Sequence, residues 1–291
     1  MSDAVDMTIV VAAVNTAETL GPWLDAIRPQ AARHHVEILV AAAADDRAMT
    51  VAEEGGFMRV VRGGPAALVP ALWGIALLEA RAPIVAVTIT ACVPAPDWLD
   101  AIVAAHRETG ADGIGGVIDC APTARMTDRA LHMVRYTPYL PPVAAGPVEE
   151  IAGDNGTYTR AALESWRAAI ARDGFWESEF HRALRADGGS LRIDPRIRVT
   201  HTRSYSLTTF SRQRFRHGRI FGRARGTSLS MPARLARLVF TPAVPAIMLG
   251  RALRTASDRG RLDARAVIAA PAAAWFHCCW AAGEAVGLLR G

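Results

Sequence analysis

The chain has 291 residues, of which 51% are hydrophobic and 21% are charged, so it holds enough apolar side chains to fill a core. This composition excludes a disordered chain, a collagen-like chain and a coiled-coil rod. All 33 basic residues are arginines, and residues 201–291 carry 15 of them against three acids. Such a cationic tail predicts an anionic partner, namely phospholipid headgroups, a pyrophosphate or nucleic acid, with a solvated basic face as the alternative.

From the N-terminus, strand and helix patterns alternate over the first 120 residues. Short, continuously apolar runs predict strands buried on both faces at 7–14, 36–44, 58–64, 83–90 and 111–119. Helical patterns predict helices at 20–29, 66–81 and 96–110. This alternation predicts an α/β fold with a mostly parallel central sheet flanked by helices, whose ligand crevice lies at the carboxyl ends of the strands.

The pattern changes after residue 120. Residues 121–150 form a looser, proline-rich stretch. The segment 151–166 predicts a loop that enters a helix, with Asp154 or Asn155 near the cap. A turn and a second helix follow at 173–189, and 190–201 predicts two short strands broken by Pro195.

The order of these pieces resembles that of family-2 glycosyltransferases, which have the GT-A fold. Five segments carry the resemblance: VVAAVNTAETL (10–20), VEILVAAAADD (36–46), IVAVTITACVPAPDWLDAI (84–102), GDNGTYTRAAL (153–163) and GFWESEFHRALRADGGSLRIDPRIRVTH (174–201). They are similar to the family's opening strand, its second strand, its DXD strand, its acceptor-side segment and its catalytic ED segment. The resemblance implies a GT-A domain over residues 1–220, followed by an arginine-rich, apolar helical tail over residues 221–291.

The chain departs from the family pattern where a metal would bind. The strand that resembles the DXD strand reads Thr88-Ile89-Thr90-Ala91 and has no carboxylate, and Asp45 and Asp46 follow the second strand a few residues late. Hard divalent cations prefer carboxylate oxygens to threonine hydroxyls. The sequence therefore leaves open both a reaction that uses Mg²⁺ or Mn²⁺ and one that uses no metal.

The resemblance implies that a sugar passes from a nucleotide-sugar donor to a lipid-linked or surface-glycan acceptor, with inversion. Glu177 aligns with the catalytic acid of the ED pair, so it is the expected base, with helix capping as its alternative role. The implied donor residues are Ala12, Asn15, Asp45, Thr88, Thr90, Arg212 and Arg214. The implied acceptor residues are Asn155, Tyr158 and Trp176, and His201 is a candidate metal ligand. Core packing, turn formation or a membrane-facing basic patch are the alternatives for these side chains.

Two uncharged stretches lie between arginines in the tail. Residues 238–250 are too few to span a bilayer, and residues 266–283 reach the borderline length but contain Pro271. An in-plane or re-entrant helical hairpin at the cytoplasmic face of an anionic membrane is expected, and two spanning helices or a soluble helical pair are the alternatives.

Two other functions compete with transfer. The missing DXD motif favours a catalytically degenerate transferase fold that binds a partner, whereas the intact Glu177 opposes it. Nucleic acid is not an expected partner, because no base-reading motif accompanies the arginines.

Overall fold

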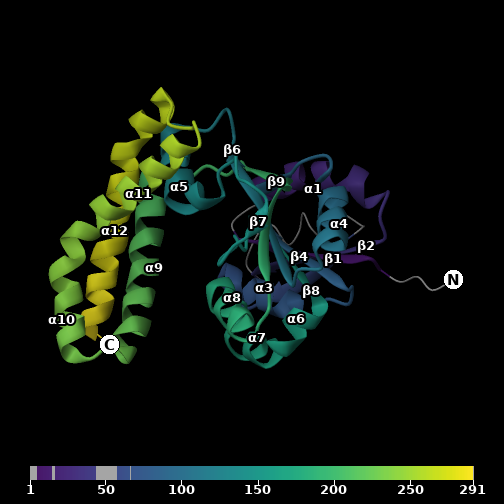
Figure 1. Cartoon of the computed structure of the whole chain (residues 1–291), viewed down its shortest axis with the longest axis horizontal. Coiled ribbons are helices and arrows are strands. Elements are labelled where there is room, and N and C mark those ends of the chain that lie inside the picture. The colour runs from purple at the N-terminus through teal and green to yellow at the C-terminus, as the bar shows by residue number, and fades with distance from the viewer. Residues whose placement is uncertain (1–4, 15–16, 44–57, 66, 291) are drawn as a thin grey trace. The chain divides into compact units, whose positions relative to one another are not determined.

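The computed structural model describes residues 5–14, 17–43, 58–65 and 67–290 (Figure 1). Contacts divide the chain into two compact units. The sheet unit comprises Met1–Asp119 and Pro141–Thr202, and the helical unit comprises Cys120–Leu140 and Arg203–Gly291. The helical unit thus begins before the boundary expected at residue 220, because the helix that contains residue 220 packs on the C-terminal helix.

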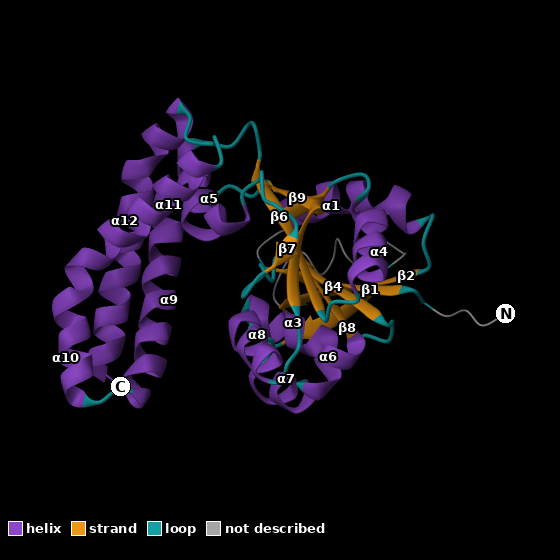
Figure 2. Cartoon of the chain, viewed as in Figure 1, coloured by secondary structure: helices purple, strands orange, loops and turns teal. Residues whose placement is uncertain are grey.

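In the part of the sheet unit that the structure describes, nine strands form one mixed sheet in the order β3-β2-β1-β4-β8-β6-β9-β5, with β7 paired to β9 (Figure 2). The strands are β1 (Met7–Ala13), β2 (Val36–Ala43), β3 (Arg59–Gly63), β4 (Ile84–Ile89), β5 (Cys92–Pro94), β6 (Gly113–Cys120), β7 (Gly146–Pro147), β8 (Asn155–Thr159) and β9 (Leu191–His201). The four apolar runs β1 to β4 pair in parallel, and β8 joins β4 antiparallel. The α/β class expected from the alternating pattern is confirmed.

Helices cover both faces of this sheet (Figure 2). The helices α1 and α4 contact β5 and β9 and also each other, whereas α3 contacts β1, β2 and α7 on the other side. The helices of the sheet unit are α1 (Ala17–Ala31), α3 (Val69–Leu77), α4 (Trp98–Thr109), α6 (Arg160–Ser165), α7 (Arg167–Asp173) and α8 (Glu177–Ala186). The α4 helix ends where expected, at Gly110, which takes a left-handed conformation.

Three local predictions are corrected. Residues 155–159 form strand β8 rather than the entry to a helix, and the helix cap is Thr159, whose hydroxyl accepts from Ala162 N. Residues 191–201 form one strand, because Pro195 lies between the segments of β9 that pair with β7 and with β5. The stretch 121–150 contains a helix, α5 (Met126–Tyr136), which packs on the C-terminal helix.

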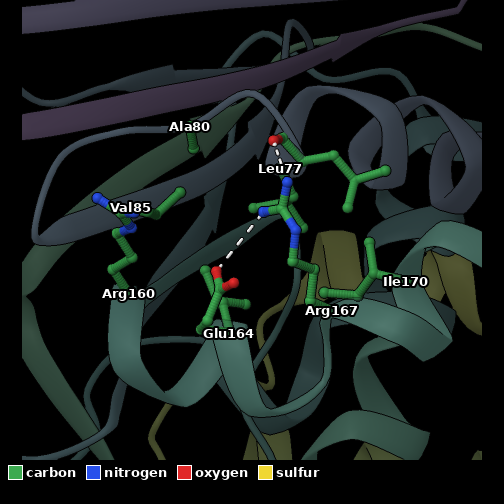
Figure 3. A pocket seen from close by; sticks show the side chains of 9 residues that line it. Leu77, Ala80, Val85, Arg160, Glu164, Arg167 and Ile170 are labelled. Carbon is green, nitrogen blue, oxygen red and sulfur yellow. Dashed lines mark hydrogen bonds and ion pairs between the residues drawn. The ribbon is translucent and has the colours of Figure 1, made fainter.

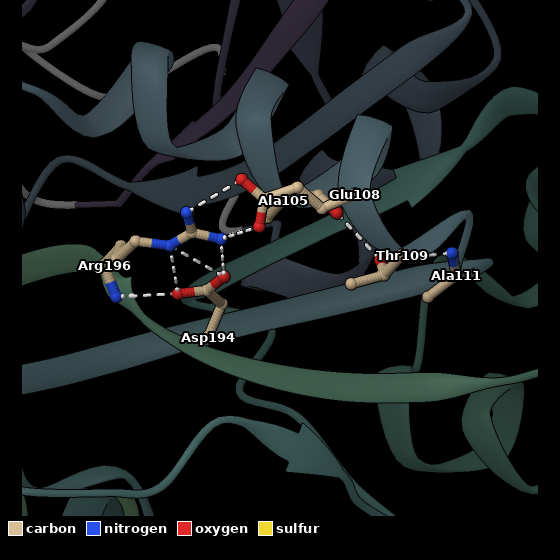
Figure 4. Close-up of polar contacts among 6 residues, drawn as sticks. All are labelled: Ala105, Glu108, Thr109, Ala111, Asp194 and Arg196. Carbon is tan, nitrogen blue, oxygen red and sulfur yellow. Dashed lines mark hydrogen bonds and ion pairs between the residues drawn. The ribbon is translucent and has the colours of Figure 1, made fainter.

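An arginine ties α4 to β9 at the edge of the sheet (Figure 4). One guanidinium nitrogen of Arg196 lies 2.6 Å from Glu108 and 2.7 Å from Asp194. Burial raises the pKa of Asp194, but the hydrogen bonds and charge of Arg196 outweigh it and hold the pKa below its usual value. This network does not include Thr88 or Thr90, the polar residues at the end of β4.

Acidification is expected to weaken the sheet unit through His106. The His106 Nε2 atom lies 2.9 Å from the hydroxyl of Thr157, which itself donates to Ile114 O. Burial lowers the pKa of His106 to about 4. Because the unfolded chain binds a proton near pH 6.5 and the folded chain does not, the free energy of unfolding should fall by about 2 kcal/mol from pH 7.5 to 5.

Urea unfolding of His106→Gln at both pH values checks this expectation. The variant should lose this part of the pH dependence, whereas His35→Gln, which changes an exposed histidine, should keep it. An equal pH dependence in His106→Gln and the wild-type protein would contradict the assignment.

The helical unit is built from α5, α9 (Leu207–Ser228), α10 (Met231–Phe240), α11 (Val244–Asp258) and α12 (Ala264–Arg290). The α9 and α12 helices run side by side in the same direction and touch at glycines (Figure 1). A methyl group on Gly222 would lie 2.2 Å from the backbone oxygen of Glu284, and one on Gly283 would lie 2.1 Å from that of Phe215. Only glycine therefore allows this approach.

The α10 helix has its polarity reversed. Its large apolar side chains, Met231, Leu235, Val239 and Phe240, are between 56% and 77% exposed. Its Arg237 instead turns inward, and its Nε atom lies 3.0 Å from the fully buried carboxylate of Glu284. By length and hydropathy, Met231–Asp258 and Ala264–Arg290 could each cross a membrane.

Candidate functional site

The carboxyl ends of β1 and β4 lie together, as parallel neighbours must. Ala12 pairs with Ile89, and the backbone N–H of Thr90 donates to Ala12 O. The Thr90 side chain is fully buried, and its hydroxyl accepts from that of Thr19 on α1 at 2.9 Å. The predicted donor residues Ala12 and Thr90 are thus brought together, but the Thr90 hydroxyl already has a protein partner.

The Thr88 position is likewise occupied by internal hydrogen bonds. Its hydroxyl donates to Asp154 O at 2.9 Å, and its carbonyl accepts from the indole N–H of Trp73 at 2.8 Å. Thr88 is fully buried. These two hydrogen bonds connect Thr88, at the end of β4, to the loop before β8 and to the α3 helix.

Glu177 is the first residue of α8 and lies close to Gly153 and Trp73. A methyl group built on Gly153 would lie 3.2 Å from the carboxyl carbon of Glu177 and 3.0 Å from the Trp73 ring. The carboxylate therefore lies against the backbone of Gly153, one residue from the carbonyl that Thr88 contacts. Glu177 as a whole is half-buried, so part of the residue is exposed to solvent.

A close approach of backbones fixes the start of α8. A methyl group on Gly74 in α3 would lie 2.8 Å from the Cα atom of Gly174, which has a φ of +82°. The next residue, Phe175, donates its backbone N–H to Pro70 O at 2.8 Å. Side chains larger than glycine at either position would push α8, and with it Glu177, away from Trp73.

The two predicted acceptor residues on β8 are enclosed in the core. The Asn155 side chain accepts from Trp98 Nε1 and donates to two backbone carbonyls, at 2.9 to 3.1 Å. The Tyr158 hydroxyl lies 2.9 Å from Nε2 of His181, a residue of α8 whose ring also lies 3.1 Å from Glu150. Both side chains are fully buried, so these contacts give them a structural part, and their contact with an acceptor stays a prediction.

The remaining predicted residues lie in several places. Trp176 is half-buried next to Glu177, and its indole N–H donates to Asp173 O. His201 is buried at the end of β9, paired with Cys92. Two further candidates, Asn15 and Asp45, lie outside the described residues. The last two, Arg212 and Arg214, lie on α9 in the helical unit.

The side chains at the end of β4 do not suit a divalent cation. Both threonine hydroxyls are buried and hydrogen-bonded within the protein. Within residues 5–14, 17–43, 58–65 and 67–290, no group of three or more histidine, cysteine or acidic side chains could hold a metal ion. The described donor set therefore lacks the carboxylates that Mg²⁺ and Mn²⁺ prefer.

A hollow lies at the opposite end of the sheet, near the start of β4. Leu77, Val85 and Ile170 line it together with Arg160 and Arg167 (Figure 3). Arg167 pairs with Glu164 and donates to Leu78 O, and Arg160 donates to Arg81 O. Because Arg167 is paired with Glu164 and both guanidinium groups donate to backbone carbonyls, we do not place the reaction in this hollow.

Sequence reasoning did not identify Trp73 and Gly153 as parts of the site. Gly153 stood within the segment that resembles the acceptor side, and Trp73 is an aromatic residue in a helix otherwise rich in alanine and leucine. The sequence signal that could have identified Trp73 is its position as the single tryptophan of this helix. Its hydrogen bond to Thr88 O could not be derived from spacing along the chain.

No family model and no curated protein sequence matches the chain. Among solved structures, it is similar to the mannosyltransferase PcManGT from Pyrobaculum calidifontis in complex with GDP-Man and Mn²⁺, with a TM-score of 0.59 and 18% identity over 98% of this chain and 87% of that one. It is also similar to TarS from S. aureus in complex with UDP-GlcNAc, with a TM-score of 0.53 and 11% identity over 72% of this chain and 64% of that one. The chain therefore has a glycosyltransferase-like α/β fold.

Proposed function

We propose that the protein transfers a sugar from a nucleotide-sugar donor to an acceptor hydroxyl, with inversion. The observation that carries this proposal is the Glu177 carboxylate, held at the start of α8 against Gly153 and beside the end of β4. In parallel α/β sheets, this edge is where ligands bind. Two solved structures to which the chain is similar are complexes with GDP-Man and UDP-GlcNAc, which supports the same donor class here.

The residues of this chain divide the chemistry as follows. Glu177 accepts the proton of the attacking acceptor, and the bond from the anomeric carbon to the diphosphate breaks on the opposite face of the sugar. The ends of β1 and β4, at Ala12, Thr88 and Thr90, border the donor. Arg212, exposed on α9, is the candidate for the negative charge of the leaving diphosphate. Trp176 offers an aromatic face to the acceptor.

The reversed polarity of α10 supports an acceptor at a membrane. A helix in water buries its apolar side chains and exposes its charged ones, whereas here Leu235 and Val239 are exposed and Arg237 is half-buried against Glu284. Apolar side chains that face outward suit lipid, and the surrounding arginines suit anionic headgroups. We therefore propose a lipid-linked or surface-glycan acceptor at the cytoplasmic face of a membrane.

Donor binding should persist without a divalent cation. Because the described hydroxyls at the end of β4 are already bonded to protein, we expect EDTA to change the affinity for the bound donor by less than about threefold. Calorimetric titration with UDP- and GDP-sugars, in Mn²⁺ and in EDTA, measures this. A donor that binds only with Mn²⁺ would contradict this expectation.

A second candidate function is a transferase fold that binds a partner without turnover. The observation that favours it is the replacement of the metal-binding carboxylates by buried, internally bonded threonines. Donor binding with no transfer and no hydrolysis of any sugar nucleotide would support this second function over the first.

A further inference from the structure

A group of basic side chains meets inside the helical unit. It comprises Arg214 and His217 on α9, His277 on α12 and Arg135 on α5, and we call it the basic cluster. His277 is 2% exposed, and neither of its ring nitrogens has a hydrogen-bond partner among the described residues. The Nε atom of Arg214 is also enclosed without such a partner there. A buried polar atom without a partner is rare and calls for an explanation.

The charges of the basic cluster act on one another. Burial, and then the charge of Arg135, lower the pKa of Arg214 to about 10. Partial desolvation, and then the charges of Arg214 and Arg135, lower the pKa of His217 to about 4. Shifts in this direction mean that each proton is held less tightly than in water, as happens when cations gather without an opposing carboxylate.

The acids of the helical unit are all placed elsewhere. Asp128 pairs with Arg125 at the start of α5, and Glu284 pairs with arginines of α9 and α10. Asp263 accepts from the first turn of α12, and Asp258 is exposed at the end of α11. This unit contains no other acid, and neither Arg214 nor His277 has a carboxylate partner among the described residues.

Contacts with aromatic rings do not replace the missing anion. The guanidinium of Arg214 lies 6.0 Å from the centre of the Trp280 ring, at the outer limit of a cation–π contact. Such a contact attracts the charge but accepts no hydrogen bond from Nε–H. An oxyanion would satisfy both the charge and the donors.

We propose that the basic cluster binds a phosphate group. Arginine matches phosphate oxygens with paired, charge-assisted hydrogen bonds, and a histidine adds a further donor. Arg214 is half-buried and His217 is exposed, so the cluster reaches the surface of the helical unit. The ligand is a phosphate or a phosphate monoester, either free in solution or at the head of a lipid. This site is additional to sugar transfer and does not depend on it.

The test uses the full chain in a neutral detergent. Inorganic phosphate should raise the melting temperature of the wild-type protein above that in sodium chloride of equal ionic strength. Arg214→Gln and His277→Gln should each weaken phosphate binding by about tenfold or more. Arg216→Gln removes the same charge from an exposed position on the same helix and should bind phosphate as the wild-type protein does.

Vesicles separate the two sources of phosphate. If the ligand is a lipid headgroup, phosphatidylcholine vesicles with phosphatidic acid should bind the wild-type protein and Arg216→Gln more tightly than Arg214→Gln. If inorganic phosphate alone distinguishes these variants, the ligand is a soluble phosphate. Broadening of the ³¹P signal by wild-type protein tests the site even where a variant fails to fold.

The proposal is overturned if phosphate has no effect on the wild-type protein, or if Arg216→Gln loses as much affinity as Arg214→Gln. A transfer assay with sugar nucleotides on the wild-type protein tests sugar transfer separately. Its failure would leave the phosphate result standing, and the reverse also holds.

Discussion

Replacing Glu177 by Gln is expected to lower kcat roughly 100- to 10,000-fold, the range that a positioned general base contributes. The amide keeps the size of the side chain and its place against Gly153, but it cannot accept a proton at neutral pH. Donor affinity should change little, because in the proposed reaction Glu177 acts on the acceptor, whereas the ends of β1 and β4 contact the donor. Single-turnover transfer, with donor binding measured by calorimetry, separates these two effects.

Glu179→Gln is the matched control. Glu179 lies in the same first turn of α8 and faces the same helix dipole, but it is exposed. If the two carboxylates merely stabilised the start of the helix, both variants would lose a similar and small amount of activity. Full transfer by Glu177→Gln would remove Glu177 as the base and leave the fold assignment intact.

Replacing Glu284 by Ala is expected to destabilise the helical unit by about 3 kcal/mol. The Glu284 carboxylate is fully buried, and one of its oxygens lies 3.3 Å from Arg225 and 3.0 Å from Arg237. Removing it takes the shared carboxylate away from two arginines whose side chains are only partly exposed, at 34% and 39%. Helical circular dichroism during thermal unfolding in detergent measures the loss.

Two variants sharpen this second test. Asp258→Ala removes an exposed acid of the same unit and should leave the melting temperature nearly unchanged. Glu284→Gln keeps the volume and one hydrogen-bond acceptor, so its loss should lie between those of the other two. If Glu284→Ala unfolds like Asp258→Ala, the ion pairs do not hold α9 and α10 to α12.

The continuous apolar runs predicted β1, β2, β4 and β6 well because these strands are buried over most of their length, on both faces. Strand β8 escaped the prediction because its residues, from Asn155 to Thr159, are mostly polar or small. Its burial is possible only since Asn155 bonds to carbonyls of β6 and β9, and Thr157 to one of β6. The α5 helix was not predicted because the sequence around it is rich in proline. It packs on α12, a contact that the local sequence does not reveal.

The sequence by itself determined the α/β class, the parallel strands β1 to β4, the place of Glu177 at the start of a helix and the excess of arginine in the tail. These features depend on local periodicity and composition, which a single chain displays directly. Only the tertiary structure decided that Trp73 and Gly153 lie close to Glu177, that the hydroxyls of Thr88 and Thr90 are already bonded, and that Arg214 has no acidic partner among the described residues. Each of these depends on a contact between residues far apart in the chain, and such contacts are set by strand register and helix packing.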